Sequence, residues 1–467
     1  MSKKLIQSSA RTAAALALLA ALSCALPVRA ASDATQPSAG RPRLVLGIMV
    51  DGLRADYLQM LADHFGTDGF NRLTRSGVVI ENVDYGPLVD RAGAIAMIYT
   101  GAAPSVNGIA TSTVYDTERH LSVPALLDPS QIGNYTDETL SPAALLTSTI
   151  SDELRIDGAG AAYVHTISPD ASCAIIMAGH AGNSAFWIHD ATCNWDTPAH
   201  YRDVPSAFSH ANFTAPLSHR IDTVRWEPVM KLEDYPGLPP HKRRYPFSHT
   251  FSRNSADVYR LFKRSAPVNA EVTSLATEYI RQMHLGSRGS MDMLNLAYTL
   301  TPFPASADTD SRLEVMDSYL RLDRELARLF REVDAQVGPD GAVIVLTGTP
   351  TEPPVEPYDP QWGLPAGEFS ARKAQSLLNL YLIARYGNGE WVTDYHDGAF
   401  YLNQQLIDSK HLDPESIRSE AAKFLCRMSG VASAHTIDDI LENRVSERLR
   451  RNTVAAKAAD VYVTILP

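Results

Sequence analysis

Two stretches of the sequence carry residue types that could do chemistry. The first ends in Asp51, which directly follows the unbroken apolar run LVLGIMV at residues 44–50. Such a run is typical of a buried parallel strand, whose carboxyl end would deliver the acid to a metal ion or a cation. The second is LVDRAGAIAMIYTGAAPSVNG at residues 88–108, which contains Arg91. Arginine cannot act as a nucleophile, because its guanidinium stays protonated.

Other catalytic motifs are missing from the sequence. It has no GxxxxGK[ST] phosphate-binding loop, no GxSxG nucleophile turn and no HExxH zinc motif. The formal net charge is −11 at pH 7. A chain this acidic is a poor candidate for binding nucleic acid, which rewards basic surfaces.

The elements that must position Asp51 alternate between strands and helices. Short apolar runs at residues 161–168, 293–300, 342–348 and 461–466 read as further strands. Residues 311–338 place apolar side chains at helical spacing and end in a glycine, which predicts a long amphipathic helix. This alternation predicts an α/β sandwich around a mostly parallel sheet flanked by helices.

A different pattern appears from about residue 195 to residue 255. This part is rich in Pro, His and aromatic residues and shows no clear period. We interpret it as the main part of a cap, inserted at approximately residues 190–290 over the carboxyl edge of the sheet, where ligands of such folds bind. The α/β domain as a whole is expected to run over residues 43–467.

The first thirty residues read as a secretory signal peptide, with a basic start, an apolar run and small residues before a cut after Ala30. A lipoprotein anchor through Cys24 is disfavoured, because Ala21 occupies a position where leucine is usual. Residues 31–42 form a polar linker. No later stretch is long and apolar enough to cross a bilayer. We therefore expect an exported protein, periplasmic or extracellular, without a transmembrane span.

Three cysteines follow the predicted leader, at Cys173, Cys193 and Cys426. Cys173 and Cys193 could form a disulfide in an oxidising compartment, closing a loop of about twenty residues. Buried free thiols are the alternative, since an odd count leaves one cysteine over in any case. The sequence leaves both readings open.

Longer motifs carry a family resemblance that runs from about residue 43 to residue 467. The chain resembles the bacterial periplasmic, threonine-nucleophile branch of the alkaline phosphatase superfamily, which is related to the type I phosphodiesterase/nucleotide pyrophosphatases. The resemblance implies an alkaline-phosphatase-like α/β fold with an inserted cap. It rests on LVLGIMVDGLRADYL, DGFNRLTRSGVVIENVDYG, IYTGAAPSVNGI, SPAALLTSTISDELR, IMAGHAGNSAFWIHDATCNW and VMDSYLRLDRELARLF.

The resemblance implies phosphoryl transfer at two zinc ions, which activate a hydroxyl nucleophile and neutralise charge on the phosphoryl group. The residues that would carry this reaction are replaced. The family's threonine nucleophile falls on Arg91, and the asparagine that contacts the phosphoryl group falls on Ser112. The Lys-x-Arg pair that clamps phosphate oxygens falls on Asp170 and Ser172. We expect no catalytic residue at these positions.

The implied zinc ligands are also mostly replaced. Asp51 remains as the first acid of the pattern. The Asp-x-x-x-His pair and the later Asp-His pair fall on Pro302, Ser306, Thr349 and Pro350, and the last histidine would lie beyond Pro467. Zinc needs about four partners, so a remnant Asp51 is a poor zinc site and no cofactor is expected.

Asp51 therefore needs another counter-charge. We predict that it pairs with Arg91, whose guanidinium would replace the positive charge of zinc, because an unpaired carboxylate in a closed pocket is costly. His180, in MAGHAGN, is expected to be a hydrogen-bonded structural residue and not a metal ligand.

Two functions from different classes follow. The first is an exported, catalytically inactive homologue of this family that binds or scaffolds an unidentified protein, glycan or small-molecule partner. The second is an active metal-dependent phosphomonoesterase or phosphodiesterase. A third reading is a decaying gene product without a selected role. If the chain ends naturally at Pro467, a sheet edge would be open to pairing, which suggests a dimer or a complex with an active relative.

Overall fold

The computed structural model describes residues 42–134, 137–202, 204–238, 240, 242–306, 310–351 and 368–466. The expected signal peptide, Cys24 and almost all of the linker lie outside these residues. Within them, no helix combines the length and hydropathy needed to cross a membrane.

The larger sheet of the described chain has seven strands in the order β11-β1-β10-β5-β6-β7-β4. The first five of these strands are mutually parallel, whereas β7 and β4 run antiparallel to their neighbours. The predicted mostly parallel sheet is therefore confirmed, as are four of the five predicted strand positions within it. The strands are β11 (Ala342–Gly348), β1 (Leu44–Asp51), β10 (Asp292–Thr299), β5 (Val164–Ile167), β6 (Ser184–Ile188), β7 (Trp195–Pro198) and β4 (Gly133–Asn134).

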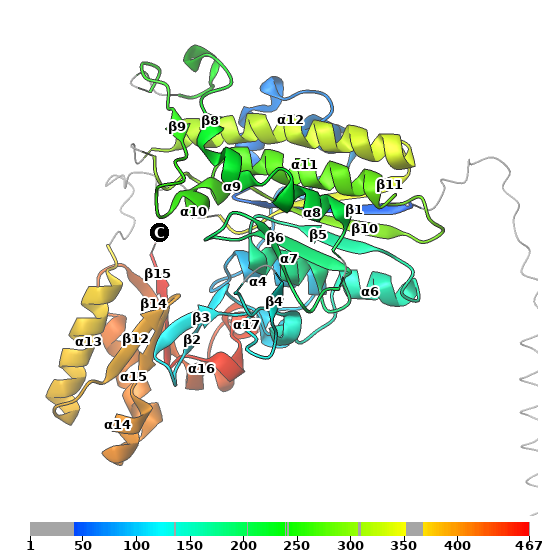
Figure 1. Ribbon diagram of the computed structural model, residues 1–467. Coiled ribbons are helices and arrows are strands. Elements are labelled where there is room, and N and C mark those ends of the chain that lie inside the picture. The colour runs from blue at the N-terminus through cyan, green and yellow to red at the C-terminus, as the bar shows by residue number, and fades with distance from the viewer. Residues whose placement is uncertain are drawn as a thin grey trace, which may run out of the picture. The chain divides into compact units, whose positions relative to one another are not determined.

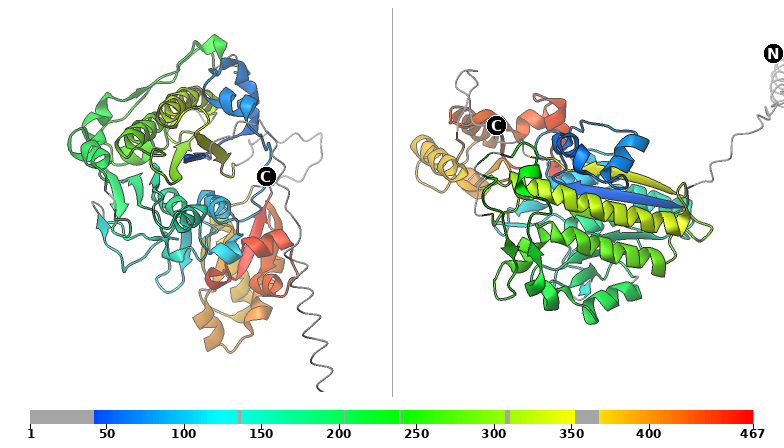
Figure 2. Two further views of the ribbon diagram at one scale, coloured as in Figure 1. Left: turned by 90° about the vertical axis from the view of Figure 1, so that its right-hand side faces the viewer. Right: turned by 90° about the horizontal axis from the view of Figure 1, so that it is seen from above.

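Helices cover both faces of this sheet (Figures 1 and 2). The long helices α11 (Pro267–Gln282) and α12 (Arg312–Val337) pack side by side on one face. The other face carries α4 (Arg91–Thr100), α7 (Ala171–Ala178) and α6 (Ile150–Asp157). The helix predicted at residues 311–338 is confirmed, and its apolar stripe lies in the core between the helices and the sheet.

Short elements fill the chain between β7 and α11, where the sequence predicts most of the cap. They are α8 (Ser206–Phe213), α9 (Leu217–Arg220), β8 (Arg225–Trp226), β9 (His249–Thr250) and α10 (Val258–Lys263). Asp317 of α12, fully buried, fixes this segment by accepting hydrogen bonds from Trp226 Nε1 at 2.7 Å and Tyr235 Oη at 2.8 Å.

A second, antiparallel sheet has the order β12-β13-β15-β14 within the described residues. Its strands are β12 (Val392–His396), β13 (Ala399–Leu402), β15 (Val461–Ile465) and β14 (Val431–Thr436), and α13 (Ala371–Tyr386) and α15 (Pro414–Leu425) pack against it. The strand predicted at residues 461–466 is thus β15, and it is not part of the parallel sheet. It also does not lie at an edge, because β13 and β14 flank it. An apolar run specifies a buried strand but not the sheet it joins.

Candidate functional site

The site is built where the carboxyl ends of parallel strands meet the amino ends of two helices. Asp51 is the last residue of β1, and the chain turns sharply at Gly52, whose φ is +82°. A Cβ at Gly52 would lie 2.9 Å from the backbone nitrogen of Thr301, so only glycine allows this turn. Thr349 follows the neighbouring strand β11. The strand ends therefore bring Asp51 and Thr349 together.

Capping residues set the position of the two helices. Asp90 caps α4 by accepting hydrogen bonds from the backbone of Ala92 and Gly93, which makes Arg91 the first helical residue. Asp170 caps α7 in the same way, by accepting from the backbone of Ser172 and Cys173. Both helices thus begin at the same edge of the sheet.

Arg91 joins the two carboxylates of the site. Its Nη1 lies 3.2 Å from Asp51 Oδ2, and its Nη2 lies 2.8 Å from Asp170 Oδ2. The predicted Arg91–Asp51 pair is confirmed. The sequence did not predict Asp170 as the second partner, although a signal was present. The resemblance implies a threonine and a lysine where this chain has Arg91 and Asp170, and a new cation beside a new anion is a complementary replacement.

Arg91 and Asp170, which form a triad with Asp51, shift each other's pKa in opposite directions. Asp170, followed by smaller contributions that include Asp51, raises the pKa of Arg91 well above its usual value despite burial. Burial alone would raise the pKa of Asp170, but Arg91, with help from Lys263 and a hydrogen bond from Ser172, holds it well below its usual range. Arg91 and Asp170 therefore stay charged at neutral pH.

The remaining oxygen of Asp51 is also occupied. Thr349 donates its hydroxyl to Asp51 Oδ1 at 2.6 Å. Both carboxylate oxygens of Asp51 thus have protein donors, so a metal ion would have to displace Arg91 or Thr349 to reach them.

The other positions implied by the family resemblance do not complete a metal site. Ser306, in the loop after β10, donates its hydroxyl to Glu314 Oε1 at 2.7 Å, and Ser172 donates to Asp170 Oδ1 at 2.5 Å. Pro302 and Pro350 have no side-chain donor atoms, and the backbone of Ser112 donates to Asp90 Oδ2 at 2.7 Å. Across the described ranges, no group of three or more His, Cys, Asp or Glu side chains could hold a metal ion. These residues do not fit two zinc ions.

A cavity of about 360 Å³ opens above the triad. Its wall includes Asp51, Arg91, Asp170 and Thr349, but not Ser112, Ser172, Pro302, Ser306 or Pro350. The rest of the wall is made of apolar, hydroxyl-bearing and charged residues: Met49, Ile95, Ser168, Pro169, Cys173, Asp190, Arg260, Lys263, Arg264, Ala297, Tyr298, Thr299 and Thr301. Four of the positions that the resemblance assigns to the reaction therefore line one cavity.

The structure also tests the predictions for His180 and for the three cysteines. His180 is hydrogen-bonded on both ring nitrogens, 3.2 Å from Asp152 Oδ2 and 2.9 Å from the carbonyl of Leu145, which confirms a structural role. Cys173 and Cys193 are buried and unpaired, and Cys426 is exposed and unpaired. The disulfide alternative is therefore not realised in this structure.

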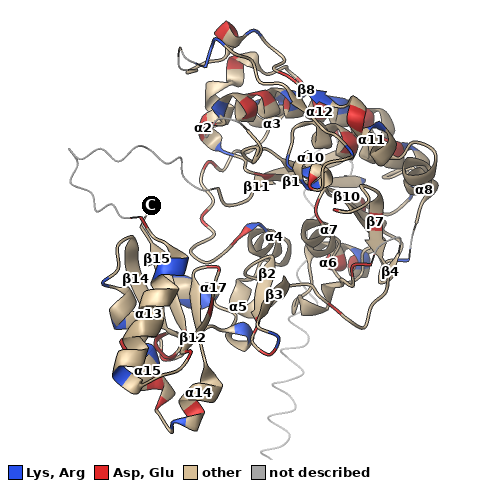
Figure 3. Cartoon of the chain, turned by 60° about the vertical axis from the view of Figure 1, so that its left-hand side comes forward, with Lys and Arg blue, Asp and Glu red and all other residues tan. Residues whose placement is uncertain are grey.

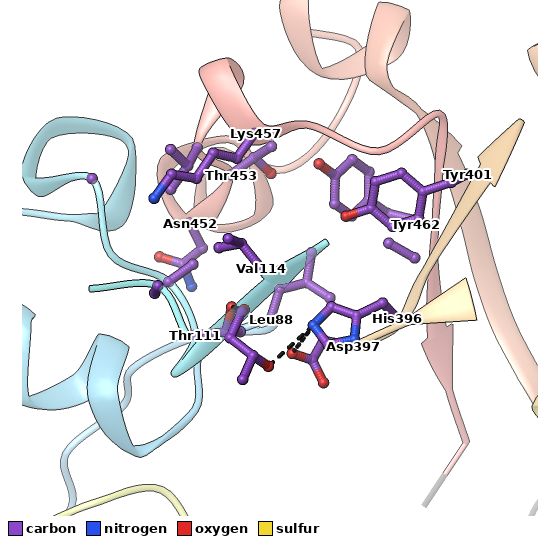
Figure 4. A pocket seen from close by; sticks show the side chains of 16 residues that line it. Leu88, Thr111, Val114, His396, Asp397, Tyr401, Asn452, Thr453, Lys457 and Tyr462 are labelled. Atoms are coloured by element: carbon purple, nitrogen blue, oxygen red, sulfur yellow. Dashed lines mark hydrogen bonds and ion pairs between the residues drawn. The ribbon is translucent and has the colours of Figure 1, made fainter. Parts of the chain in front are cut away.

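A smaller pocket of about 70 Å³ lies between the β2–β3 hairpin (Thr113–Asp116, Leu121–Pro124) and the second sheet (Figure 4). His396, at the end of β12, is one of its polar residues. The imidazole contacts Thr113 Oγ1 at 3.1 Å and Ser122 Oγ at 2.9 Å, and lies 3.0 Å from Asp397. These bonds attach the hairpin to the second sheet.

Comparison with known proteins adds a family. Residues 45–349 match the type I phosphodiesterase/nucleotide pyrophosphatase model. Alkaline phosphatase PhoV of Synechococcus elongatus is 25% identical over 445 residues, which cover 91% of this chain and 80% of that protein. Alkaline phosphatase PafA of Elizabethkingia meningoseptica is 25% identical over 435 residues, with 89% and 79% covered. The wild-type PafA crystal structure aligns with a TM-score of 0.77 at 23% identity, covering 93% of this chain and 86% of that one, which shows a shared fold.

Proposed function

The chain belongs to the type I phosphodiesterase/nucleotide pyrophosphatase family, and from this premise we propose that it is a catalytically inactive member that keeps its fold for binding. The observation that carries the proposal is the double ion pair of Arg91 with Asp51 and Asp170. The guanidinium supplies, within hydrogen-bonding distance, the positive charge that the carboxylates need. It cannot supply a nucleophile or an open coordination position.

The chemistry that remains in the cavity supports the same proposal. Cys173 is the thiol nearest to the triad, and burial raises its pKa far above neutrality, so it is not a thiolate at physiological pH. Asp170 is an anion where the family's phosphate clamp has a cation, so it would repel a phosphoryl group at that point. Loss of a catalytic nucleophile alone costs several orders of magnitude in rate.

An active phosphomonoesterase or phosphodiesterase is the competing function. It is favoured by the relatives, because PhoV and PafA are alkaline phosphatases. The two functions differ in a measurable way: the active enzyme requires stoichiometric metal, and the inactive homologue does not.

Export and a binding partner are part of the proposal. The leader-like sequence of residues 1–30 supports delivery to the periplasm or the outside of the cell. The edge strand β11 exposes Val343 and Val345 to 43% and 50%, and such an edge suits pairing with another chain, either a second copy or an active relative. A monodisperse monomer in light scattering at micromolar concentration would remove the support for pairing.

The decisive experiment combines metal analysis with phosphatase assays. The purified protein is analysed for zinc and assayed on aryl phosphate mono- and diesters, before and after chelator treatment. We expect substoichiometric zinc and no turnover above background in either state. Stoichiometric zinc together with turnover that chelator abolishes would refute the proposal. The variant Arg91→Thr restores only the hydroxyl, so we expect it to stay inactive while the metal ligands are missing.

A further inference from the structure

The cavity above Arg91 combines an apolar interior with a charged mouth. Met49, Ile95, Cys173 and Ala297 line it and are each at most 5% exposed, so they form its inner wall. Hydroxyl groups, among them those of Thr299 and Thr301, lie in the same wall. A cavity of about 360 Å³ with this lining suits a small organic molecule with an apolar body.

The charges at the base of the cavity are already compensated. Arg91 contacts both Asp51 and Asp170, and Asp51 also accepts the hydroxyl of Thr349. A ligand that used Arg91 as its anchor would have to break an ion pair that is only partly exposed, which is costly. The base therefore does not offer a free charge to a ligand.

The charges at the mouth are different. Arg260, Lys263 and Arg264 follow each other at helical spacing along α10 and its last turn, so they share one face of the helix, and all three line the cavity. Figure 3 shows this basic cluster on α10. Arg264 is exposed, and its guanidinium makes no hydrogen bond or ion pair with the described residues. Lys263 is 13% exposed and binds Asp190 at 2.5 Å, and Arg260 is paired at the surface with Asp257, which precedes α10.

Three of the four basic residues in the cavity wall have acidic partners. The basic residues of the wall are Arg91, Arg260, Lys263 and Arg264, and its acidic residues are Asp51, Asp170 and Asp190. Arg91 and Lys263 contact these acids, and Arg260 is paired with Asp257. The Arg260–Asp257 pair is 65% and 56% exposed, so solvent screens it, whereas Arg264 has no acidic partner among the described residues. Arg264 therefore gives a small anion an unpaired cation at the mouth of the cavity, in a chain whose net charge is −11.

We propose that this cavity binds a small organic anion, with its apolar body against the inner wall and its carboxylate or phosphate on Arg264 and Arg260 of α10. The inference rests on the proposed function. The ion pairs of Arg91 that remove catalysis also leave the base of the cavity without a free cation, so an anion has to be recognised at α10. An anion held there stays at the mouth, away from the Arg91 triad.

The test measures binding by calorimetry with benzoate and phenyl phosphate as probes and benzyl alcohol as a neutral control. We expect the two anions to bind with Kd values below about 1 mM and the alcohol to bind roughly tenfold more weakly. Higher salt should weaken anion binding, because the cations are exposed to solvent. If benzoate and phenyl phosphate bind with similar Kd values, the site accepts small organic anions in general. If one of them binds more tightly, the site prefers carboxylates or phosphates accordingly.

Variants locate the site. The double variant R260Q/R264Q should bind the preferred anion roughly fivefold or more weakly, while R372Q, which removes an exposed arginine on α13 outside the cavity, should bind as wild type does. Thermal unfolding confirms that each variant is folded. Absence of binding to wild type, or equal binding by wild type and R260Q/R264Q, would overturn the anion site. Hydrolysis of phenyl phosphate would instead overturn the proposed inactivity and leave the site standing.

Discussion

Removal of Arg91 is the sharpest perturbation of the candidate site. Arg91→Met keeps the length of the side chain but takes away the donor of two charge-assisted hydrogen bonds, at 3.2 Å and 2.8 Å. Each such bond contributes about 1.5–3 kcal/mol, and breaking a buried ion pair costs about 3–5 kcal/mol. The side chains of Arg91, Asp51 and Asp170 are 32%, 20% and 31% exposed, so water screens part of this loss. We expect the free energy of unfolding at pH 7 to fall by about 2–4 kcal/mol.

The loss should depend on pH in a defined direction. In the wild type, Arg91 holds the folded-state pKa of Asp170 below the unfolded value of about 3.9, so Asp170 contributes stability above about pH 4 that is lost as the pH falls further. In the variant the guanidinium is absent, so burial raises the pKa of Asp170. Protonation of Asp170 at lower pH then removes part of the free-energy cost of burying its charge. The difference between the two proteins is therefore largest near pH 7 and shrinks toward pH 4.

Urea denaturation at several pH values measures this difference. Arg385→Met is the matched control, because Arg385 is 55% exposed and binds Glu420 at the surface. We expect the control to lose less than about 1 kcal/mol at every pH. A loss below about 1 kcal/mol for Arg91→Met at pH 7, or a loss that is the same near pH 4 and pH 7, would refute the assignment of Arg91 as the counter-charge of the site.

Three further predictions concern the structure around the site. A hydrogen bond to the buried Asp152 raises the pKa of His180, so the stability that this pair contributes is complete below about pH 6.5 and is lost as the pH rises through the raised value. In urea denaturation, His180→Asn should therefore lower the unfolding free energy more near pH 5.5 than near pH 8.5. An equal loss at both pH values would contradict the pairing. Asp317→Ala should lower the unfolding free energy by about 3–5 kcal/mol in urea denaturation, because four hydrogen bonds to a buried carboxylate are lost. A loss below about 1 kcal/mol would contradict the role of Asp317 in fixing the segment between β7 and α11. A thiol reagent should label the exposed Cys426 in the native protein but not the buried Cys173 or Cys193. Burial also raises the pKa of Cys193 to about 12, so its thiol stays protonated. Rapid labelling of either buried cysteine in the native protein would contradict the burial.

The sequence by itself determined the elements of the parallel sheet. The apolar runs that became β1 and β10 are buried on both faces, so their composition identifies them as strands without knowledge of their partners. The same holds for the long stripe of α12. Asp51 could be placed at a strand end for this reason, and its pairing with Arg91 followed from the cost of a buried, unpaired carboxylate.

Only the tertiary structure decided which distant residues meet. Asp170 caps α7 and Arg91 begins α4, and nothing local in either sequence says that these two helix ends share one edge of the sheet. The basic cluster on α10 reaches the same cavity from the segment where the sequence predicts the cap, and β15 joined a sheet that its apolar run could not identify. Patterns of burial and helix capping depend on residues a few positions apart, so they can be predicted from the sequence. Ion pairs and cavities depend on how distant segments meet in space, so they cannot.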